Sequence, residues 1–370
     1  MDVLISGASI AGLTTAHWLA RHGHHVTVVE RSDGLRSGGV SIDVREEAVE
    51  VARAMGIWED VRRLRVPHDD VYRFVDESGA TQAELRPAAD VYDNTEDVEI
   101  SRDVLADLLR AAVPDDVDFR FDTWITAITT APDGGRAVTL DDGSVLVVDL
   151  VVGADGMHSA VRELVFGPER QFVHHLGLYV SIAKRCRSVG VATGSEVLNT
   201  PGRMVMLRSD GTSTSALLGF RSEWLEHDFR DVAAQREIVR RAFAGMEGWV
   251  APEAVAEVVG AEDFYFDSVS QIRMPSWTGE RTALVGDAGY CASFFSGMGT
   301  TLAMVGARAL AEALEEAPGV PAALRAYDQR MRPIVERAQA IADQGAALLF
   351  PTTREAIEER NAALRAAAPA

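Results

Sequence analysis

Hydrophobic and polar positions near the start of the chain predict a strand, a helix and a second strand in close succession. Residues 2–6 (DVLIS) form a short apolar run of the kind that makes a buried strand. Residues 10–23 carry a helical pattern that ends at a glycine, and residues 24–30 (HHVTVVE) form a second apolar run. We therefore expect a βαβ unit at the start of the chain.

Further helices and hairpins are expected along the rest of the chain. Residues 101–113 predict a helix with Ser101 as its N-cap, because apolar residues follow at helical spacing. Alternating patterns interrupted by turn residues predict hairpins over 71–85, 137–156 and 205–220, the last turning at Asp210 and Gly211, and a strand over 262–272. After a strand that ends in ALV, helices are expected from about 299 to 316 and from about 321 to 348.

This order of elements predicts an α/β protein in which one lobe is assembled from three separated segments. We expect that first lobe at 1–70, 101–168 and 276–320. A lobe richer in strands is expected at 71–100 and 169–275, followed by C-terminal helices at 321–370.

Composition narrows the classes of partner. The chain has 370 residues, 47% of them hydrophobic, and a formal net charge of −20. The electrostatic field of a chain with this negative charge does not attract nucleic acids or anionic membranes. No apolar run approaches the roughly 18 residues that a membrane helix needs. Cys186 and Cys291 stand far apart in the sequence without metal-ligand spacing. We therefore expect no disulfide framework, no metal site and a cytoplasmic location.

The first chemical motif is GASIAG, residues 7–12, between the first expected strand and helix. It matches the dinucleotide fingerprint GxGxxG at Gly7 and Gly12, whereas Ser9 stands at the middle glycine. Glu30 ends the second strand about twenty residues further on, where a carboxylate accepts hydrogen bonds from an adenosine ribose. The alternative is a glycine-rich turn that only packs a helix on a sheet.

The second motif is GDAGYCASFFSGMGTTLA, residues 286–303, at another strand-to-helix crossing. Asp287 directly follows the strand, and Gly297 and Gly299 stand where the next helix begins. Glycines at such a crossing let backbone amides approach a ligand closely, because no Cβ stands in the way. Asp287 is therefore a candidate ligand-holding carboxylate.

Taken together, the spaced motifs resemble those of a known enzyme family. GASIAGL with VVER, ISRDVL, VVGADGMHSAVR (151–162) and LVGDAGYCASFFSGMGTTLA occur in the order seen in class A FAD-dependent monooxygenases, the para-hydroxybenzoate hydroxylase-like aromatic hydroxylases. GGVSIDVR (38–45), QIRMP (271–275) and SGMGT (296–300) are similar to the tetracycline-modifying and polyketide-tailoring branch. The resemblance implies a Rossmann-like FAD-binding lobe built from discontinuous segments, with an inserted sheet-rich substrate lobe.

The resemblance also implies which residues hold the cofactor. The pyrophosphate and adenosine would lie against the first motif and the end of the second strand, and the flavin against the arginines, the ADG turn and the second motif. The implied FAD-binding residues are Gly7, Ser9, Ile10, Ala11, Gly12, Glu30, Arg31, Arg45, Arg102, Asp155, Gly156, Asp287, Gly297, Met298 and Gly299.

As implied by the resemblance, NADPH or NADH reduces FAD, and a C4a-hydroperoxyflavin formed with O2 hydroxylates an aromatic or polyketide-type small molecule. The implied protein is a monomer or homodimer. Besides Ser9, two positions depart from the family pattern: Tyr290 stands where histidine is frequent, and Phe294 stands where many members carry proline. Phe294 therefore leaves a flavoprotein reductase or oxidase as an alternative. A second alternative is a non-catalytic binder that uses the cavity to hold an aromatic metabolite.

An apolar pocket for the substrate is expected on the strands at 203–208 and 213–221. Met206, Phe220 and Phe294 are its candidate lining residues, although an aromatic or methionine at strand spacing is more often ordinary core. Arg208 and Arg221 are candidates for pairing with an acidic substrate, the alternative being surface arginines without a ligand. We interpret Cys291 as a small buried residue and His158 as a variable turn position.

Overall fold

The computed structural model describes residues 1–35, 41–66, 71–86, 96–209, 211, 213–228 and 231–367, without the side chains of 343 and 344. Residues 38–40 of the GGVSIDVR motif and Asp210 of one expected turn lie outside the described residues. The chain divides into two compact units. The first comprises Met1–Arg65, Glu96–His174 and Ser270–Ala342, and the second Val66–Thr95, His175–Val269 and Asp343–Ala370.

These bounds differ from the expected lobes at several places. Residues 169–174 belong to the first unit rather than to the strand-rich one, and Val66 already belongs to the second unit. Residues 96–100 belong to the first unit, because the strand Val98–Ser101 (β6) pairs with Ser41–Val44 (β3) there. Residues 270–275 also belong to it, and Ile272 N donates a hydrogen bond to Cys291 O across 3.0 Å. The expected C-terminal segment is shared between the units, since the long helix α11 (Val320–Leu349) is continuous across residue 342.

A mostly parallel six-stranded sheet forms the centre of the first unit. Its order is β17-β18-β11-β1-β2-β7, with parallel pairing throughout except between β17 and β18. The strands are β1 (Asp2–Ser6), β2 (His25–Val29), β7 (Asp118–Arg120), β11 (Leu150–Gly153), β17 (Thr278–Gly279) and β18 (Thr282–Leu284). With α1 (Ile10–Arg21) between β1 and β2, the predicted βαβ unit is confirmed.

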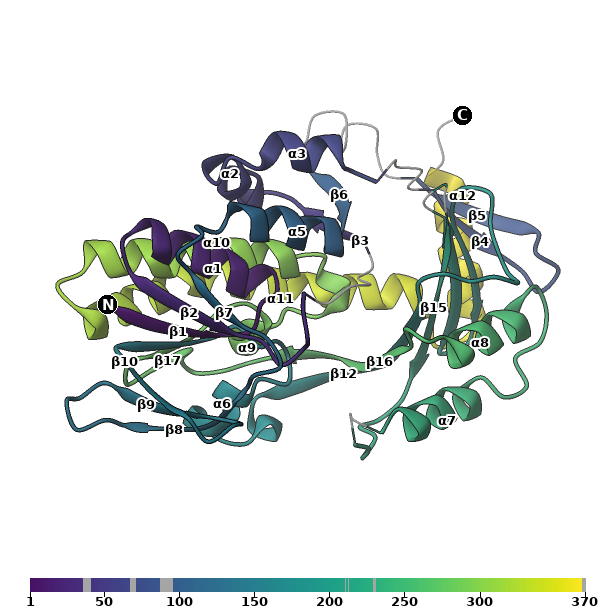
Figure 1. Ribbon diagram of the computed structural model, residues 1–370. Helices are drawn as coiled ribbons and strands as arrows, with labels where there is room; N and C mark the ends of the chain where they lie inside the picture. Colours follow the sequence, from purple (N-terminus) through teal and green to yellow (C-terminus); the bar gives the residue numbers. More distant parts are fainter. Residues whose placement is uncertain are drawn as a thin grey trace. The chain divides into compact units, whose positions relative to one another are not determined.

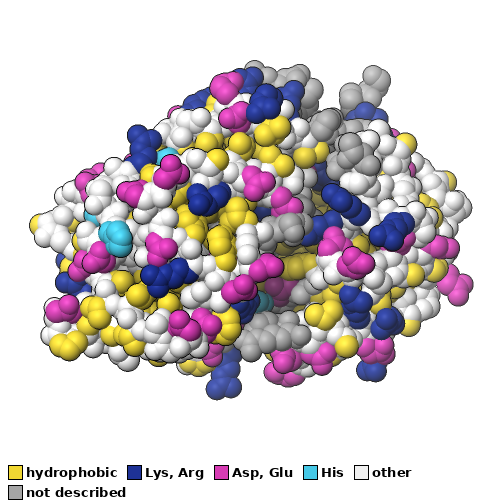
Figure 2. Space-filling view, viewed as in Figure 1, with side chains coloured by type: hydrophobic (Ala, Val, Ile, Leu, Met, Phe, Trp, Pro, Cys, Tyr) yellow, Lys and Arg dark blue, Asp and Glu magenta, His cyan; other side chains and the backbone are white. Residues whose placement is uncertain are grey.

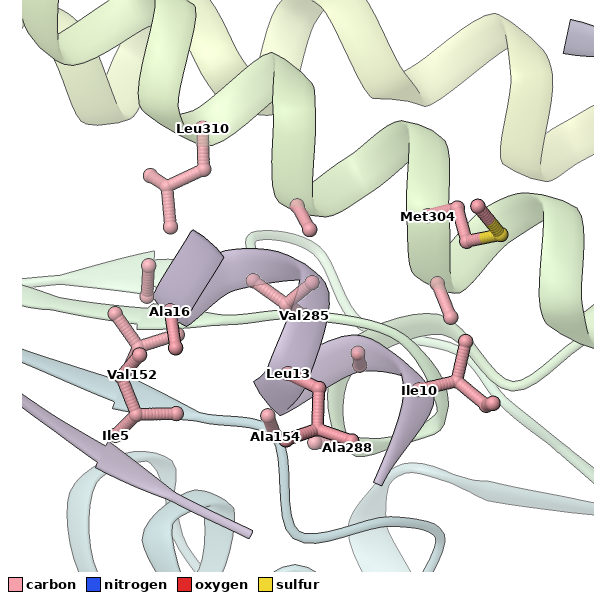
Figure 3. Packing of buried hydrophobic residues seen from close by; sticks show 14 of the residues in the cluster. Ile5, Ile10, Leu13, Ala16, Val152, Ala154, Val285, Ala288, Met304 and Leu310 are labelled. Atoms are coloured by element: carbon pink, nitrogen blue, oxygen red, sulfur yellow. The ribbon is translucent and has the colours of Figure 1, made fainter. Parts of the chain in front are cut away.

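Helices including α1 cover one side of this sheet, and a small antiparallel sheet within residues 125–148 lies on the other side together with helix α6 (Ala160–Phe166) (Figure 1). Helix α1 packs beside α10 (Gly299–Glu316), and Figure 3 shows Leu13, Val285 and Met304 in the buried core between helices and sheet. The remaining elements of the unit are α2 (Glu47–Ala54), α3 (Trp58–Arg63), α5 (Arg102–Ala112), β8 (Ile125–Thr130), β9 (Arg136–Leu140), β10 (Val145–Val148), η1 (Glu169–Gln171), α9 (Asp287–Tyr290) and η2 (Phe294–Ser296).

The second unit is built on a seven-stranded sheet of order β16-β12-β15-β14-β13-β4-β5. The strands are β4 (Tyr72–Val75), β5 (Thr81–Leu85), β12 (Val173–Ala183), β13 (Gly194–Thr200), β14 (Arg203–Ser209), β15 (Thr214–Arg221) and β16 (Tyr265–Ile272). Its helices are α7 (Val232–Ala242), α8 (Ala251–Gly260), α12 (Arg354–Ala367) and the end of α11. The sheet-rich character is confirmed, and the unit also contains helices α7 and α8, which were not predicted individually.

The surface shown in Figure 2 mixes acidic and basic side chains rather than gathering the basic ones in one stretch. In the part of the chain that the structure describes, no helix has the length and apolar character needed to cross a membrane. The mixed α/β architecture predicted from the sequence is confirmed.

Candidate functional site

The sequence motifs of the first unit meet at one edge of its parallel sheet. Strands β1, β2, β11 and β18 run in the same direction, so their carboxyl ends share that edge. Residues 7–12 follow β1, Glu30 follows β2, the Asp155-Gly156 turn follows β11, and Asp287 follows β18. The chain passes from β1 to β2 on one side, whereas after β11, the neighbour of β1 on the other side, it continues to β17 and β18 in the opposite direction. Open α/β sheets bind ligands where the connections diverge in this way.

The two glycines of the first motif are required by close backbone packing. Gly7 has φ +103°, and a Cβ there would lie 2.4 Å from Ala154 O. A Cβ on Gly12 would lie 1.9 Å from Gly7 O. The chain therefore turns tightly from β1 into α1, whose first amides have no acceptor within the helix and are available to an anion.

Glu30 is buried and accepts hydrogen bonds with both carboxylate oxygens. Its Oε2 accepts from Ala8 N at 2.9 Å, and its Oε1 accepts from Ser32 N at 3.0 Å. Each oxygen keeps a second lone pair, so the carboxylate can still accept from hydroxyl groups of a ligand. The neighbouring Arg31 is exposed.

Ser9, the departure from the glycine fingerprint, is linked to the predicted Arg102. Ser9 occupies the N-cap position of α1, but its side chain makes no capping hydrogen bond. Its Oγ instead accepts from Arg102 Nη2 at 2.7 Å. Arg102 begins α5, so this contact joins the first loop to a helix that starts more than ninety residues later. Ile10 and Ala11 form the buried first turn of α1.

Arg45 lies against the glycine turn that precedes α10. Gly297 has φ +64°, and a Cβ there would lie 3.1 Å from Arg45 Nη1. Arg45 is only partly exposed, and its Nη2 pairs with Asp43 Oδ2 at 2.6 Å. Its Nε is buried with no hydrogen-bond partner among the described residues. The structure therefore brings Arg45 and the second motif together, and adds Asp43, which sequence reasoning missed.

Helix α10 begins directly after this turn. Met298 is buried at its N-cap, and no acidic residue stands in its first turn. Apart from its own helix and chain neighbours, no atom of the described residues lies within 4 Å of the position that a Cβ on Gly299 would take. An 18-residue helix presents partial positive charge at its N-terminus, which favours a negatively charged group there.

Asp287 is exposed and begins the short helix α9 directly after Gly286. Gly286 has φ +67°, and a Cβ there would lie 3.0 Å from the Cβ of Ala11. The strand-to-helix loop of the second motif therefore lies against the first turn of α1, which carries the first motif. This strand-to-helix crossing contains the short helices α9 and η2.

In the ADG turn, Asp155 accepts hydrogen bonds at the start of helix α6, whose N-cap is Ser159. Its Oδ1 accepts from Ser159 Oγ at 2.5 Å and its Oδ2 from Val161 N at 3.1 Å. Burial raises the pKa of this carboxyl group, and these hydrogen bonds oppose the rise. Gly156 has φ +83° with open space where a Cβ would project. His158 points to Glu169, with Nδ1 and Oε1 2.9 Å apart.

Arg162 is a site residue that the sequence analysis did not single out. Its side chain is fully buried, and its Nη1 donates to Ala288 O at 2.9 Å. Its Nη2 donates to Met157 O and to Glu169 Oε2, both at 2.6 Å. The guanidinium therefore links the loop after β11 to the loop after β18. One feature of the sequence could have indicated this role: Arg162 follows the N-cap Ser159 by three residues, within the motif VVGADGMHSAVR.

Comparisons with known proteins agree with this geometry. The FAD binding domain family matches residues 1–342. A flavin-dependent monooxygenase of an unknown prokaryotic organism is 36% identical, over 97% of this chain and 94% of its own. One from Legionella longbeachae is 34% identical over 92% and 87% of the two chains. The crystal structure of tetracycline destructase Tet(55) superposes with a TM-score of 0.84 at 35% identity, covering 98% of this chain and 94% of that one.

The chain belongs to the flavin-dependent monooxygenases. The cofactor of this family is FAD, and the residues at the sheet edge fit it on three structural grounds. Gly7 and Gly12 leave no room for a Cβ. Among the described residues, no atom outside helix α10 and the chain neighbours lies within 4 Å of a Cβ position on Gly299, and the buried Nε of Arg45 has no hydrogen-bond partner. The predicted family, fold and FAD cofactor are thereby confirmed.

Two departures from the family pattern occupy different environments in this monooxygenase. Tyr290 is fully buried, its hydroxyl lies 2.9 Å from that of Tyr327, and burial raises its pKa to about 12. Its role is therefore in packing. Phe294 remains 45% exposed and meets Phe295 edge to face. Cys291 is buried, as expected of a small interior residue.

The two pocket candidates on the second unit's sheet point to opposite faces. In the β14–β15 pairing Met206 lies opposite Leu217 and Arg203 opposite Phe220, and successive residues alternate between faces. Phe220 is buried in an aromatic cluster with Tyr179 and Phe266, whereas Met206 is partly exposed. They cannot both line a pocket on one face of the sheet.

Among the described residues of the monooxygenase, no group of three or more His, Cys, Asp or Glu side chains is arranged to hold a metal ion. The two cysteines, Cys186 and Cys291, are free thiols. Burial, with nearby acidic residues, raises the pKa of the Cys186 thiol to about 11, so this group is protonated at neutral pH.

Proposed function

We propose that this monooxygenase uses NADPH or NADH and O2 to hydroxylate an aromatic or polyketide-type small molecule. One observation carries the proposal. The loops after four parallel strands meet at one edge of the sheet, and Gly7 and Gly12, directly after β1, leave no room for a Cβ there. The similarity to structures named tetracycline destructases and to fungal FAD-dependent monooxygenases supports the substrate class.

The adenosine end of FAD is assigned to the first motif. The amides of Ile10, Ala11 and Gly12 at the start of α1 would receive the pyrophosphate, because a helix N-terminus attracts negative charge. Glu30 would accept the ribose hydroxyls with its remaining lone pairs, and Arg31 would lie beside the adenosine. Ser9 would add its hydroxyl hydrogen as a donor while its oxygen accepts from Arg102.

The flavin end is assigned to the opposite part of the same edge. The start of α10, residues 297–299, would present its amides to the ring edge of the flavin, where the helix dipole stabilises negative charge. Arg45 and Arg102 would lie along the cofactor. Asp287 would accept hydrogen bonds from the ribityl chain, which fits an exposed carboxylate beside the first turn of α1. Asp155 and Gly156 would fix the turn beside the cofactor.

FAD, when bound, accepts a hydride from a nicotinamide nucleotide and activates O2 for transfer of one oxygen atom to the substrate. The tasks of this chain are binding, orientation and exclusion of water, since water releases the activated oxygen as hydrogen peroxide. The hydrogen bonds of Arg162 and Asp155 would help to orient the cofactor, because they hold the loops after β11 and β18 in fixed positions relative to each other.

We assign substrate contact to the Met206 face of the second unit's sheet. Met206 is partly exposed there, whereas Phe220 lies on the opposite face and packs against Tyr179, Phe243 and Phe266. In the first unit, the exposed Phe294 would supply an apolar wall where many relatives carry proline. We further propose a cytoplasmic monomer or homodimer, which agrees with the two free thiols.

The test is oxygen transfer itself. FAD-loaded protein is incubated with NADPH or NADH, isotope-labelled O2 and one of two probes, tetracycline or para-hydroxybenzoate. Mass spectrometry then follows the label. Label in an organic product supports hydroxylation. A different result would favour a reductase or oxidase: the nicotinamide nucleotide is consumed, but hydrogen peroxide is the only labelled product with these and other phenolic probes. In that case Phe294 is the residue to mutate next.

A further inference from the structure

An arginine-lined groove lies wholly within the second unit. It has a volume of about 730 Å³ and is formed by the β13–β14 turn, the end of β15, helix α7 and Thr352. Among the residues that the structure describes, three arginines line it, Arg203, Arg221 and Arg241, and no aspartate or glutamate does. In a chain with 56 acidic and 36 basic side chains, a lining with only positive charge is a local reversal of the overall field.

Two of these guanidinium groups have no carboxylate partner in the described part of the chain. Arg203 Nη1 donates to Ala244 O at 3.3 Å, and Arg221 Nε donates to Phe350 O at 3.0 Å. Both contacts engage only one nitrogen and only neutral backbone oxygens. Arg241 pairs with Glu237 on α7, at 2.8 Å between Nε and Oε1. Arg203 and Arg221 therefore retain donors for an anion, and the planar guanidinium matches a carboxylate well.

The other wall of the groove is apolar and held in place. Phe220 lies directly opposite Arg203 in the β14–β15 pairing, so the ring and the guanidinium share one face. Phe220 stacks on Tyr179 with ring centroids 5.6 Å apart and meets Phe243 edge to face. Leu225, also in the lining, donates its backbone N–H to the Tyr179 hydroxyl at 2.8 Å. The apolar wall is therefore preformed.

The backbone beneath the arginines is also fixed. Arg221 N donates to Gly202 O at 2.8 Å, and Gly202 N donates to Pro351 O at 2.9 Å. Binding a ligand here would order few additional groups, which lowers the entropic cost of binding. Because Phe220 and Met206 point to opposite faces, the groove is distinct from the sheet face to which we assign substrate contact.

We propose that this groove is an accessory site for an aromatic carboxylate, with the carboxylate on Arg203 and Arg221 and the ring on Phe220 and Leu225. None of these residues belongs to the FAD motifs, so the site does not depend on the oxygenation reaction. The positive charge of the arginines favours a carboxylate group on the ligand. The adjoining apolar wall favours a ligand with a ring over a small inorganic anion.

The probe pair is 1-naphthoate and its neutral counterpart 1-naphthamide, each titrated calorimetrically into the FAD-loaded protein. We expect saturable naphthoate binding at concentrations up to about 1 mM, and at least tenfold weaker binding of the amide. Arg203→Gln and Arg221→Gln should each weaken naphthoate binding about tenfold, because each removes a charge-assisted contact. The control is Arg240→Gln, an exposed arginine of α7 that does not line the groove.

Thr352→Glu provides a second test that leaves the arginines and their backbone contacts in place. Thr352 is exposed, so a carboxylate there should repel the probe without loss of folding, checked by circular dichroism. Weaker naphthoate binding in this variant and in either arginine variant, with Arg240→Gln unchanged, supports the site. Absence of binding, equal affinity for both probes, or unchanged affinity in the groove variants would overturn it.

Discussion

Arg162 donates a hydrogen bond from Nη1 to the carbonyl oxygen of Ala288 across 2.9 Å, joining the loops that follow β11 and β18. The same guanidinium reaches Met157 O and Glu169 Oε2. Burial lowers its pKa, and the neighbouring carboxylates of Glu169 and Asp155 oppose that change. A buried charge held in this way fixes two loops of the cofactor site in one arrangement.

Arg162→Met should therefore weaken both the fold and cofactor binding. We expect the free energy of unfolding to fall by about 3 kcal/mol, because Glu169 and two carbonyl groups lose their buried partner. Urea denaturation and the FAD content after purification measure the two effects. Arg170→Met, at an exposed position of η1, is the matched control and should change stability by less than about 0.5 kcal/mol. Full FAD retention in Arg162→Met would contradict its positioning role.

Gly7→Ala tests the close packing at the start of the site. The added Cβ would meet Ala154 O at 2.4 Å, and φ +103° is unfavourable for alanine, so we expect a protein that folds poorly and does not retain FAD. Gly23→Ala separates the two causes, because Gly23 has φ +80° with nothing within 4 Å. That variant should lose only about 1 kcal/mol and keep its FAD. Equal FAD content in both variants would show that the close approach is unimportant.

Glu30→Gln should raise the dissociation constant of FAD by about tenfold. The amide group replaces one carboxylate oxygen by a donor, which then faces the N–H of Ala8 or of Ser32. Titration of the apoprotein by flavin fluorescence gives the constant directly. Glu163→Gln, an exposed position on α6, is the control. An unchanged constant in Glu30→Gln would remove Glu30 from the adenosine site.

Met206 and Phe220 should respond differently to truncation. Phe220→Ala removes a ring from a buried aromatic cluster and should lower the free energy of unfolding by about 3 kcal/mol. Met206→Ala, at a partly exposed position, should lower it by less than about 1 kcal/mol while raising KM for an accepted substrate. A change in stability alone for Met206→Ala would assign this residue to the core as well.

His17 should make stability depend on pH. Its Nδ1 lies 2.6 Å from Ala112 O, and its buried Nε2 has no partner among the described residues. Burial lowers its pKa from 6.5, so the unfolded chain binds the proton more tightly than the folded one. The stability contributed by neutral His17 is complete above about pH 6.5 and decreases as the pH falls below that value.

His17→Gln should therefore lose less stability than the parent protein between about pH 7.5 and pH 5.5, as measured by urea denaturation at each pH. The comparison variant is His25→Gln, because the side chain of His25 is 70% exposed whereas that of His17 is buried. His24 also has a pKa lowered by burial, and its contribution has the same sign. Identical profiles for His17→Gln and the parent protein would exclude His17 as a source of the dependence.

Local sequence patterns were sufficient for the elements that carry the site. The expected helix from about 299 to 316 is observed as Gly299–Glu316, and the βαβ unit is observed from Asp2 to Val29. Helix α7 was not predicted, because only Gln235 and Val239 are buried and its apolar stripe is short. Helix α8 lies in the same stretch, for which the surrounding alternating segments suggested strands.

The sequence by itself determined the βαβ start, the glycines at both crossings and the family resemblance, because backbone conformation and hydrophobic period are local properties. Tertiary structure alone decided that Arg102 meets Ser9, that Arg45 meets Gly297 and that Arg162 joins two loops. It also decided that Met206 and Phe220 point to opposite faces. These relationships depend on strand order and register, which are fixed by packing between segments distant in the sequence.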